Sequence, residues 1–216
     1  IDKASYRYAV EYEPRDFDGE VVTIPSSGRN VRPLVDMAVK DVEEGKSVMI
    51  LATCGFMLRG VIAVLRQDGI PFHNPYRPTH GGWNPLRGGR GRLLSYLRPD
   101  PETNPEWQRW WTWKEAKAWV DIVRSADSLT RGGKAWVRSL GNNEEIQNQI
   151  MEDEDVVKMF GEHWAGLRDS FTEEDPIKWL DERLLLSKRR MMEYPIAIAR
   201  KWGRDRLRED PKICVG

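Results

Sequence analysis

The chain has 216 residues, and its 34 Lys or Arg residues balance its 34 Asp or Glu residues, so the formal net charge is zero. This length has room for one large domain or two small ones. The balance excludes a general attraction to nucleic acid, so any such binding must come from local patches. Two cysteines, Cys54 and Cys214, are too few for a disulfide framework, and a reducing, cytoplasmic setting is expected. No apolar run approaches the roughly 18 residues of a membrane span, and we expect no membrane partner.

The first predicted elements are a helix and a strand on either side of Gly45-Lys46-Ser47. The strand is the apolar run from Val48 to Ala52, which is typical of a strand covered on both faces of a sheet. The helix is predicted from apolar residues at helical spacing, namely Val31, Leu34, Val35, Ala38 and Val42. The tripeptide matches the end of a phosphate-binding P-loop, but Lys40 stands where that loop needs a glycine, and helix and strand are in the reverse order. We interpret Gly45 as a helix C-cap, with Lys46 near the last carbonyls.

A second helix is predicted directly after this strand. Its apolar residues are Phe56, Val61, Val64 and Leu65, and it ends at Gly69 and Pro71. A strand followed by a helix is the alternation found in doubly wound α/β domains.

Between Asp68 and Asp100 the chain carries no acidic residue. It carries cations and rings instead: Arg77, Arg87, Arg90, Arg92, Arg98, His73, His80, Phe72, Tyr76, Trp83 and Tyr96. Proteins that bind single-stranded nucleic acid use this combination, because arginines neutralise phosphates and rings stack on bases. A surface linker with solvated arginines explains the composition equally well, and both interpretations stay open.

After Asp100 the pattern changes to helices that carry most of the tryptophans. Local signals set their predicted bounds: a capping box at Thr112 and Glu115, a start near Asp153 or Asp155, an N-cap at Asp175 before Pro176, and an end at Gly203 after a break or kink at Pro195. The tryptophan tract is expected to pack in a core, and a base-stacking platform is the alternative. That tract consists of Trp107, Trp110, Trp111, Trp113 and Trp119.

Signals for catalysis are weak. The three histidines lack ligand-like spacing with either cysteine, so a zinc site is not expected. The acidic run from Glu152 to Asp155 could hold a hard cation or simply begin a helix. No nucleophile elbow, dinucleotide fingerprint or HExxH motif is present. On its residues alone the chain has no assignable catalytic, cofactor-binding or metal-binding residue.

Several segments, taken in order, resemble UvrD/Rep-type superfamily 1 DNA helicases. The run from Val48 to Phe72 resembles the segment in which a strand enters an Arg-bearing helix and then a Gly-Ile-Pro-aromatic turn. The terminal Pro-Lys-Ile-Cys-Val-Gly resembles the strand that leads into the family's Thr-Ile-His motif. Further landmarks are Pro14-Arg15-Asp16, Gly19-Glu20-Val21-Val22, Gly82-Trp83-Asn84-Pro85-Leu86 and Ser187-Lys188-Arg189-Arg190.

The resemblance implies an α/β fold with a partial RecA-like parallel sheet and a mostly α-helical inserted subdomain. Residues 1–86 and 211–216 would belong to the second RecA-like motor domain, and residues 87–210 would form the helical accessory domain. We interpret the chain, which starts at Ile1 without a Met, as a fragment of a longer helicase. ATP and Mg are expected for the full-length parent, because the P-loop, the Mg-binding acidic motif and the arginine finger of such enzymes would lie outside this chain. No cofactor and no ATP hydrolysis are expected for the chain alone.

The resemblance also implies DNA, single-stranded or at a junction, and the remainder of the helicase chain as partners. In the family, Arg and Asn side chains just after the first strand touch single-stranded DNA. Thr53 and Gly55 occupy those places here, which limits contact to a hydroxyl or the backbone. Arg59 is retained and could equally be a structural helix arginine. The candidate DNA-binding residues are Thr53, Arg59, Trp83, Arg87, Arg90 and Arg92.

Two expectations about function follow. Replacing Arg87, Arg90 and Arg92 together by Ala should weaken DNA binding more than Arg59→Ala alone. The alternative to a helicase fragment is a non-catalytic nucleic-acid or protein binding module that shares only the α/β segment.

Overall fold

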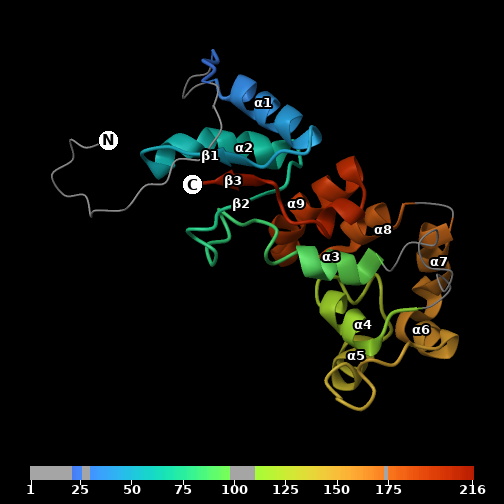
Figure 1. Ribbon diagram of the computed structural model, residues 1–216. Coiled ribbons are helices and arrows are strands. Elements are labelled where there is room, and N and C mark those ends of the chain that lie inside the picture. Colours follow the sequence, from blue (N-terminus) through green and yellow to red (C-terminus); the bar gives the residue numbers. More distant parts are fainter. Residues whose placement is uncertain (1–20, 26–29, 98–109, 173–174) are drawn as a thin grey trace.

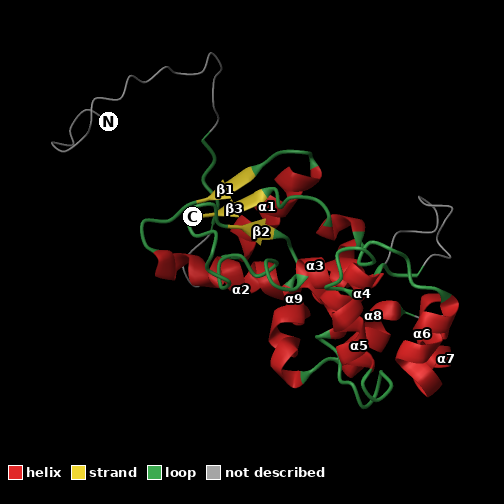
Figure 2. Cartoon of the chain, turned by 90° about the horizontal axis from the view of Figure 1, so that it is seen from below, coloured by secondary structure: helices red, strands yellow, loops and turns green. Residues whose placement is uncertain are grey.

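A small parallel sheet with two helices, and a larger group of helices beside it, make up the part of the chain that the structure describes (Figures 1 and 2). The structure is a computed structural model, and it describes residues 21–25, 30–97, 110–172 and 175–216. The chain is therefore mixed α/β, as predicted.

The last strand of the chain lies in the middle of the sheet. The strands are β1 (Val48–Ile50), β2 (Phe72–His73) and β3 (Ile213–Val215), and β3 pairs in parallel with each of the other two. The prediction that the segment before Gly216 returns to the sheet of the first strand is confirmed. β1 is an edge strand with Ile50 buried but Met49 53% exposed, so the prediction that both its faces are covered is wrong.

Helix α1 (Arg32–Glu43) ends where the sequence predicted. Gly45 has φ +90°, the N–H of Gly45 donates to Val42 (3.0 Å), and the N–H of Lys46 donates to Asp41 (2.9 Å). These two bonds and the left-handed glycine form a Schellman cap. The ammonium of Lys46 lies 2.8 Å from the Asp41 carboxylate and 2.7 Å from that of Glu44. Helix, cap and strand follow in that order, opposite to the order in a phosphate-binding loop.

The second helix also matches its prediction. A 3-10 turn, η1 (Gly55–Leu58), leads into α2 (Arg59–Gln67), and the chain turns at Gly69 with φ +61°. α1 and α2 pack against each other, and α1 also contacts β1.

The larger group consists of helices with little sheet between them. They are α3 (Arg90–Leu97), α4 (Trp113–Val120), α5 (Gly133–Leu140), α6 (Asp153–Phe160), α7 (Trp164–Thr172), α8 (Pro176–Arg183) and α9 (Leu186–Trp202), with 3-10 turns η2 (Gly161–His163) and η3 (Asp205–Leu207). The predicted starts of α4, α6 and α8 are confirmed, including the capping box of Thr112 and Glu115. α3, α5 and α7 had no predicted counterpart.

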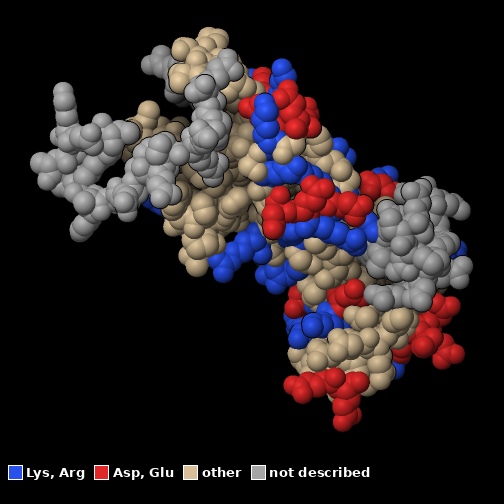
Figure 3. Space-filling view, viewed as in Figure 1, with Lys and Arg blue, Asp and Glu red and all other residues tan. Residues whose placement is uncertain are grey.

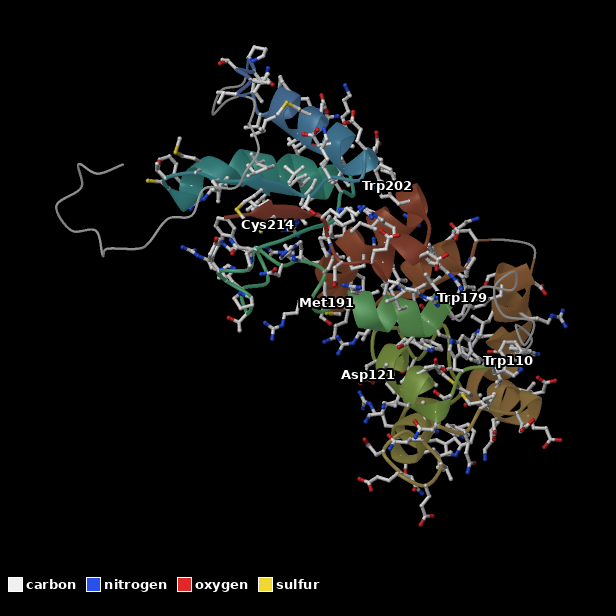
Figure 4. All side chains as sticks on the ribbon, in the orientation of Figure 1. Trp110, Asp121, Trp179, Met191, Trp202 and Cys214 are labelled. Carbon is white, nitrogen blue, oxygen red and sulfur yellow. The ribbon has the colours of Figure 1, made fainter. Side chains whose placement is uncertain are left out.

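Aromatic rings fill the centre of the helical group. Trp111, Trp119 and Tyr96 are fully buried, and the Trp119 ring lies 4.9 Å from that of Trp111 and 5.2 Å from that of Tyr96. Trp179, labelled in Figure 4, stacks on the other side of Tyr96 at 6.2 Å. The prediction that the tryptophan tract packs in a core is confirmed for its buried members, Trp111, Trp113 and Trp119, whereas Trp110 is half-buried and Trp107 lies outside the described residues.

Helix α9 joins the two parts of the molecule. It continues through Pro195 to Gly203, so the predicted break is wrong. Pro195 has no N–H to donate to the carbonyl of Met191. Gly89 packs closely on this place, because a Cβ at Gly89 would lie 2.6 Å from the Met191 carbonyl oxygen. Farther along α9, the Trp202 indole N–H donates to the Gly69 carbonyl at 2.8 Å.

Candidate nucleic-acid interface

Two adjoining depressions lie between α2, the loop of residues 74–89 and the first half of α9. The first has a volume of about 590 Å³ and the second about 610 Å³, and both are lined by Arg66 and Gly82. We refer to the two together as the trough. Its side chains come from η1 and α2 (Phe56, Arg59, Ile62 and Arg66), from the loop (Arg77, His80, Trp83, Asn84 and Arg87) and from α9 (Arg190 and Met191).

Two asparagines hold the loop side of the trough in shape. The buried Asn74 accepts hydrogen bonds through its side-chain oxygen from the N–H groups of Tyr76 (2.8 Å) and Arg77 (2.9 Å). Asn84 accepts from the N–H of Asn74 at 2.9 Å and donates to the Arg77 carbonyl at 2.8 Å. Asn favours turns because its side chain bonds the backbone in this way. The loop is thus closed on itself, and the positions of Arg77 and Trp83 are fixed.

A tryptophan and an arginine form one wall of the first depression. The guanidinium of Arg77 lies over the Trp83 ring, 5.2 Å from its centroid. A Cβ at Gly55 would lie 3.4 Å from the Trp83 ring, so the glycine lets the ring approach the backbone of η1. Trp83 therefore connects the loop to the end of β1.

Arginines dominate the trough, and no carboxylate lines it. Within the described part of the chain, none of its five arginines takes part in an ion pair; Arg87 donates to the Pro78 carbonyl instead (2.6 Å). Those five are Arg59, Arg66, Arg77, Arg87 and Arg190. Most arginines elsewhere lie within 4.0 Å of a carboxylate, for example Arg32, Arg90, Arg124, Arg138, Arg168, Arg183, Arg200, Arg204, Arg206 and Arg208.

The surface view agrees with this contrast. In Figure 3, blue atoms gather below the sheet at the loop that follows β2, whereas blue and red alternate over the helices. Met191, labelled in Figure 4, lies at the end of the trough beside α3. An unneutralised set of guanidinium groups in an open depression is suited to a polyanion.

The structure brings together half of the predicted DNA-binding residues. Arg59, Trp83 and Arg87 line the trough. Thr53 is exposed next to η1 but does not line it. Arg90 and Arg92 lie in α3: Arg90 donates to the Arg208 carbonyl (2.6 Å) and faces Asp210, and Arg92 donates to the Gly88 carbonyl (2.9 Å).

The rings of the acid-free stretch also divide. Phe72 and Tyr96 are buried in the core, so neither can stack on a base, and the nucleic-acid interpretation was wrong for these two. Tyr76 is 70% exposed but lies outside the trough. Arg98 lies outside the described residues.

Sequence analysis missed Arg66 and gave Arg190 only as part of a basic tract. Arg59 and Arg66 are seven residues apart, which is about two helical turns, so both occupy one face of α2. That spacing is a signal present in the sequence. Nothing in the sequence places Arg190 beside Arg66, because α9 reaches this point only through tertiary packing.

The described residues contain no group of three or more His, Cys, Asp or Glu side chains that could hold a metal ion. In the acidic run, Glu152 and Asp155 bond each other's backbone N–H groups in a capping box at the start of α6. The helix-start interpretation of that run is confirmed.

Comparison of the chain with protein-family models, with curated protein sequences and with solved structures gives no match. In the described part of the chain, no helix combines the length and the apolar character needed to cross a membrane.

Proposed function

We propose that the trough binds single-stranded nucleic acid, and that the chain supplies part of the DNA track of an ATP-driven helicase or translocase. The observation that supports this proposal is the set of five arginines without carboxylate neighbours that line one open depression. Phosphate binding by arginine releases counterions and is strong only where the arginines are not already neutralised.

The arrangement of the elements is compatible with the helicase part of the proposal. The trough lies beside the turn that follows β1, and in open α/β sheets ligands bind beyond the carboxyl ends of parallel strands. In this proposal, residues 1–86 and 211–216 are part of the second RecA-like motor domain and residues 87–210 are the accessory domain. The cytoplasmic setting belongs to the same proposal, and the two thiols, Cys54 and Cys214, are both free.

Binding of a fluorescently labelled oligothymidylate tests the trough. The variant is Arg59→Ala, Arg66→Ala and Arg190→Ala together, because these three side chains have no ion pair and their loss should leave the fold intact. At about 0.5 to 1 kcal/mol for each exposed charge contact, we expect the dissociation constant to rise about 10- to 100-fold.

The control removes the same charge elsewhere. Arg124, Arg131 and Arg138 are exposed and lie in or near α5, outside the trough. Their combined replacement by Ala should leave binding within about twofold of the unchanged chain, since exposed contacts outside the site contribute little. Equal weakening by the two triple variants would mean that binding follows net charge and not the trough.

The motor assignment has its own test. The coding sequence on either side of the chain should contain a P-loop upstream and a Thr-Ile-His-type motif directly after Gly216. A non-catalytic binding module would have neither motif, and the trough would then serve binding alone.

A further inference from the structure

We propose that the first depression of the trough takes one unpaired base of the strand, stacked on the ring of Phe56. This inference rests on the proposed function and specifies which part of the nucleic acid the trough recognises besides its phosphates.

Phe56 is an apolar ring held in the open among guanidinium groups. It is 67% exposed, and it lines the first depression together with Arg59 and Arg66. Leu58, in the same 3-10 turn, is 2% exposed and anchors the turn in the core. The core therefore does not need Phe56, whereas a base stacked on its ring would remove apolar surface from water.

Trp83 is the other large ring of this depression, and it is already occupied. The Arg77 guanidinium covers one face, 5.2 Å from the centroid, and the Gly55 backbone packs against the ring. The outer face of Arg77 remains a planar surface on which a base can also stack. The phosphates on either side of the base would then meet Arg59 and Arg66, which line the same depression.

The competing explanation is that Phe56 belongs to a protein-contact surface. Leu51, Met57 and Tyr76 are also exposed, and Leu51 and Tyr76 both lie close to Gly216. Tyr76 provides the matched control, because its ring is exposed at the same end of the sheet but does not line the trough.

Two labelled oligonucleotides of equal length separate base contacts from phosphate contacts. One is an oligothymidylate and the other is a fully abasic deoxyribose-phosphate strand. We expect the unchanged chain to bind the oligothymidylate about 5- to 150-fold more tightly, the range that corresponds to one stacked base. Phe56→Ala should remove this preference without weakening the abasic strand, and Phe56→Tyr and Tyr76→Ala should both keep it.

The outcomes distinguish this inference from the proposed function. If the chain binds both strands equally and Phe56→Ala changes nothing, the base site is refuted while the phosphate trough stands. If Tyr76→Ala removes the preference as fully as Phe56→Ala, the base does not lie in the trough, and the inference is also wrong. If the chain binds neither strand, the proposed function fails and this inference fails with it.

Discussion

The arginines of the trough differ from the other arginines of the chain in their neighbours. Arg138 lies 2.7 Å from Asp121, and Arg200 lies 3.2 Å from Asp181, so these charges are neutralised locally. Exposed pairs of this kind contribute at most about 1 kcal/mol to stability. Arg59 and Arg66 have no such neighbour, and burial does not constrain them. Their positions therefore matter for binding and not for the fold.

Tyr194 is a residue on which the fold itself depends. Its hydroxyl donates to the Ile70 carbonyl and so connects α9 to the turn before β2. Tyr194→Phe leaves that carbonyl without its partner and should lower the free energy of unfolding by about 1 to 3 kcal/mol. Urea denaturation at neutral pH measures this difference.

The same residue gives the stability a pH dependence. Burial raises the pKa of Tyr194 above its ordinary value of 10.0. Its contribution is therefore fully present below pH 10.0 and is lost above it, because the unfolded chain releases the proton first. The difference between the unchanged chain and Tyr194→Phe should narrow as the pH rises beyond this value. A difference that stays constant would show that the hydroxyl is not shielded from solvent.

At the scale of elements, the contact between the start of α3 and the middle of α9 decides how the two parts meet. A Cβ at Gly89 would lie 2.6 Å from the Met191 carbonyl oxygen and 2.8 Å from the Pro195 ring. Both are parts of a packed helix that cannot move aside easily. Gly89→Ala should therefore destabilise the chain by about 1 to 3 kcal/mol.

Gly91, two residues farther along, is the matched control. It lies inside α3, and a Cβ there would meet nothing within 4 Å. Gly91→Ala should be neutral or stabilise the chain by up to about 1 kcal/mol, since alanine loses less backbone freedom in a helix. Thermal unfolding of both variants gives the comparison, and equal effects at the two sites would contradict the close packing of Gly89 on α9.

Elements bounded by local chemistry could be predicted from the sequence. The cap at Gly45, the capping box of Thr112 and Glu115 and the N-cap at Asp175 each depend on bonds within a few residues. The path of α9 through Pro195 could not be predicted, because the contact that accommodates the proline comes from Gly89, more than a hundred residues away. The site divides in the same way: Arg59, Trp83 and Arg87 were found from composition, whereas Arg190 joins them only through packing.

At the scale of the whole molecule, the chain should not bind ATP by itself. The tripeptide Gly45-Lys46-Ser47 lies between a helix and a strand, and the Lys46 ammonium is paired with Asp41 and Glu44, which raises the pKa of Lys46. No helix N-terminus faces this turn to receive phosphates. Titration calorimetry with Mg-ATP should show no heat of binding at micromolar concentrations. Binding that disappears in Lys46→Ala would overturn this interpretation of the turn.

The affinity for single-stranded DNA should be modest for the whole chain. Zero net charge provides no long-range attraction. The free energy of binding therefore depends on the few phosphates that reach the trough, and we expect micromolar or weaker dissociation constants at low salt. The helicase proposal adds the remainder of the parent chain, which would complete the DNA track.

The salt dependence of oligothymidylate binding tests the trough most directly, because it counts phosphate contacts. Each contact with a single strand contributes about −0.7 to the slope of log affinity against log salt concentration. Replacing Arg59, Arg66 and Arg190 together by Ala should therefore make the slope less steep by about 2. The control triple of Arg124, Arg131 and Arg138 should keep the slope of the unchanged chain. An unchanged slope in the trough variant would contradict the account, since the phosphates would then bind somewhere else.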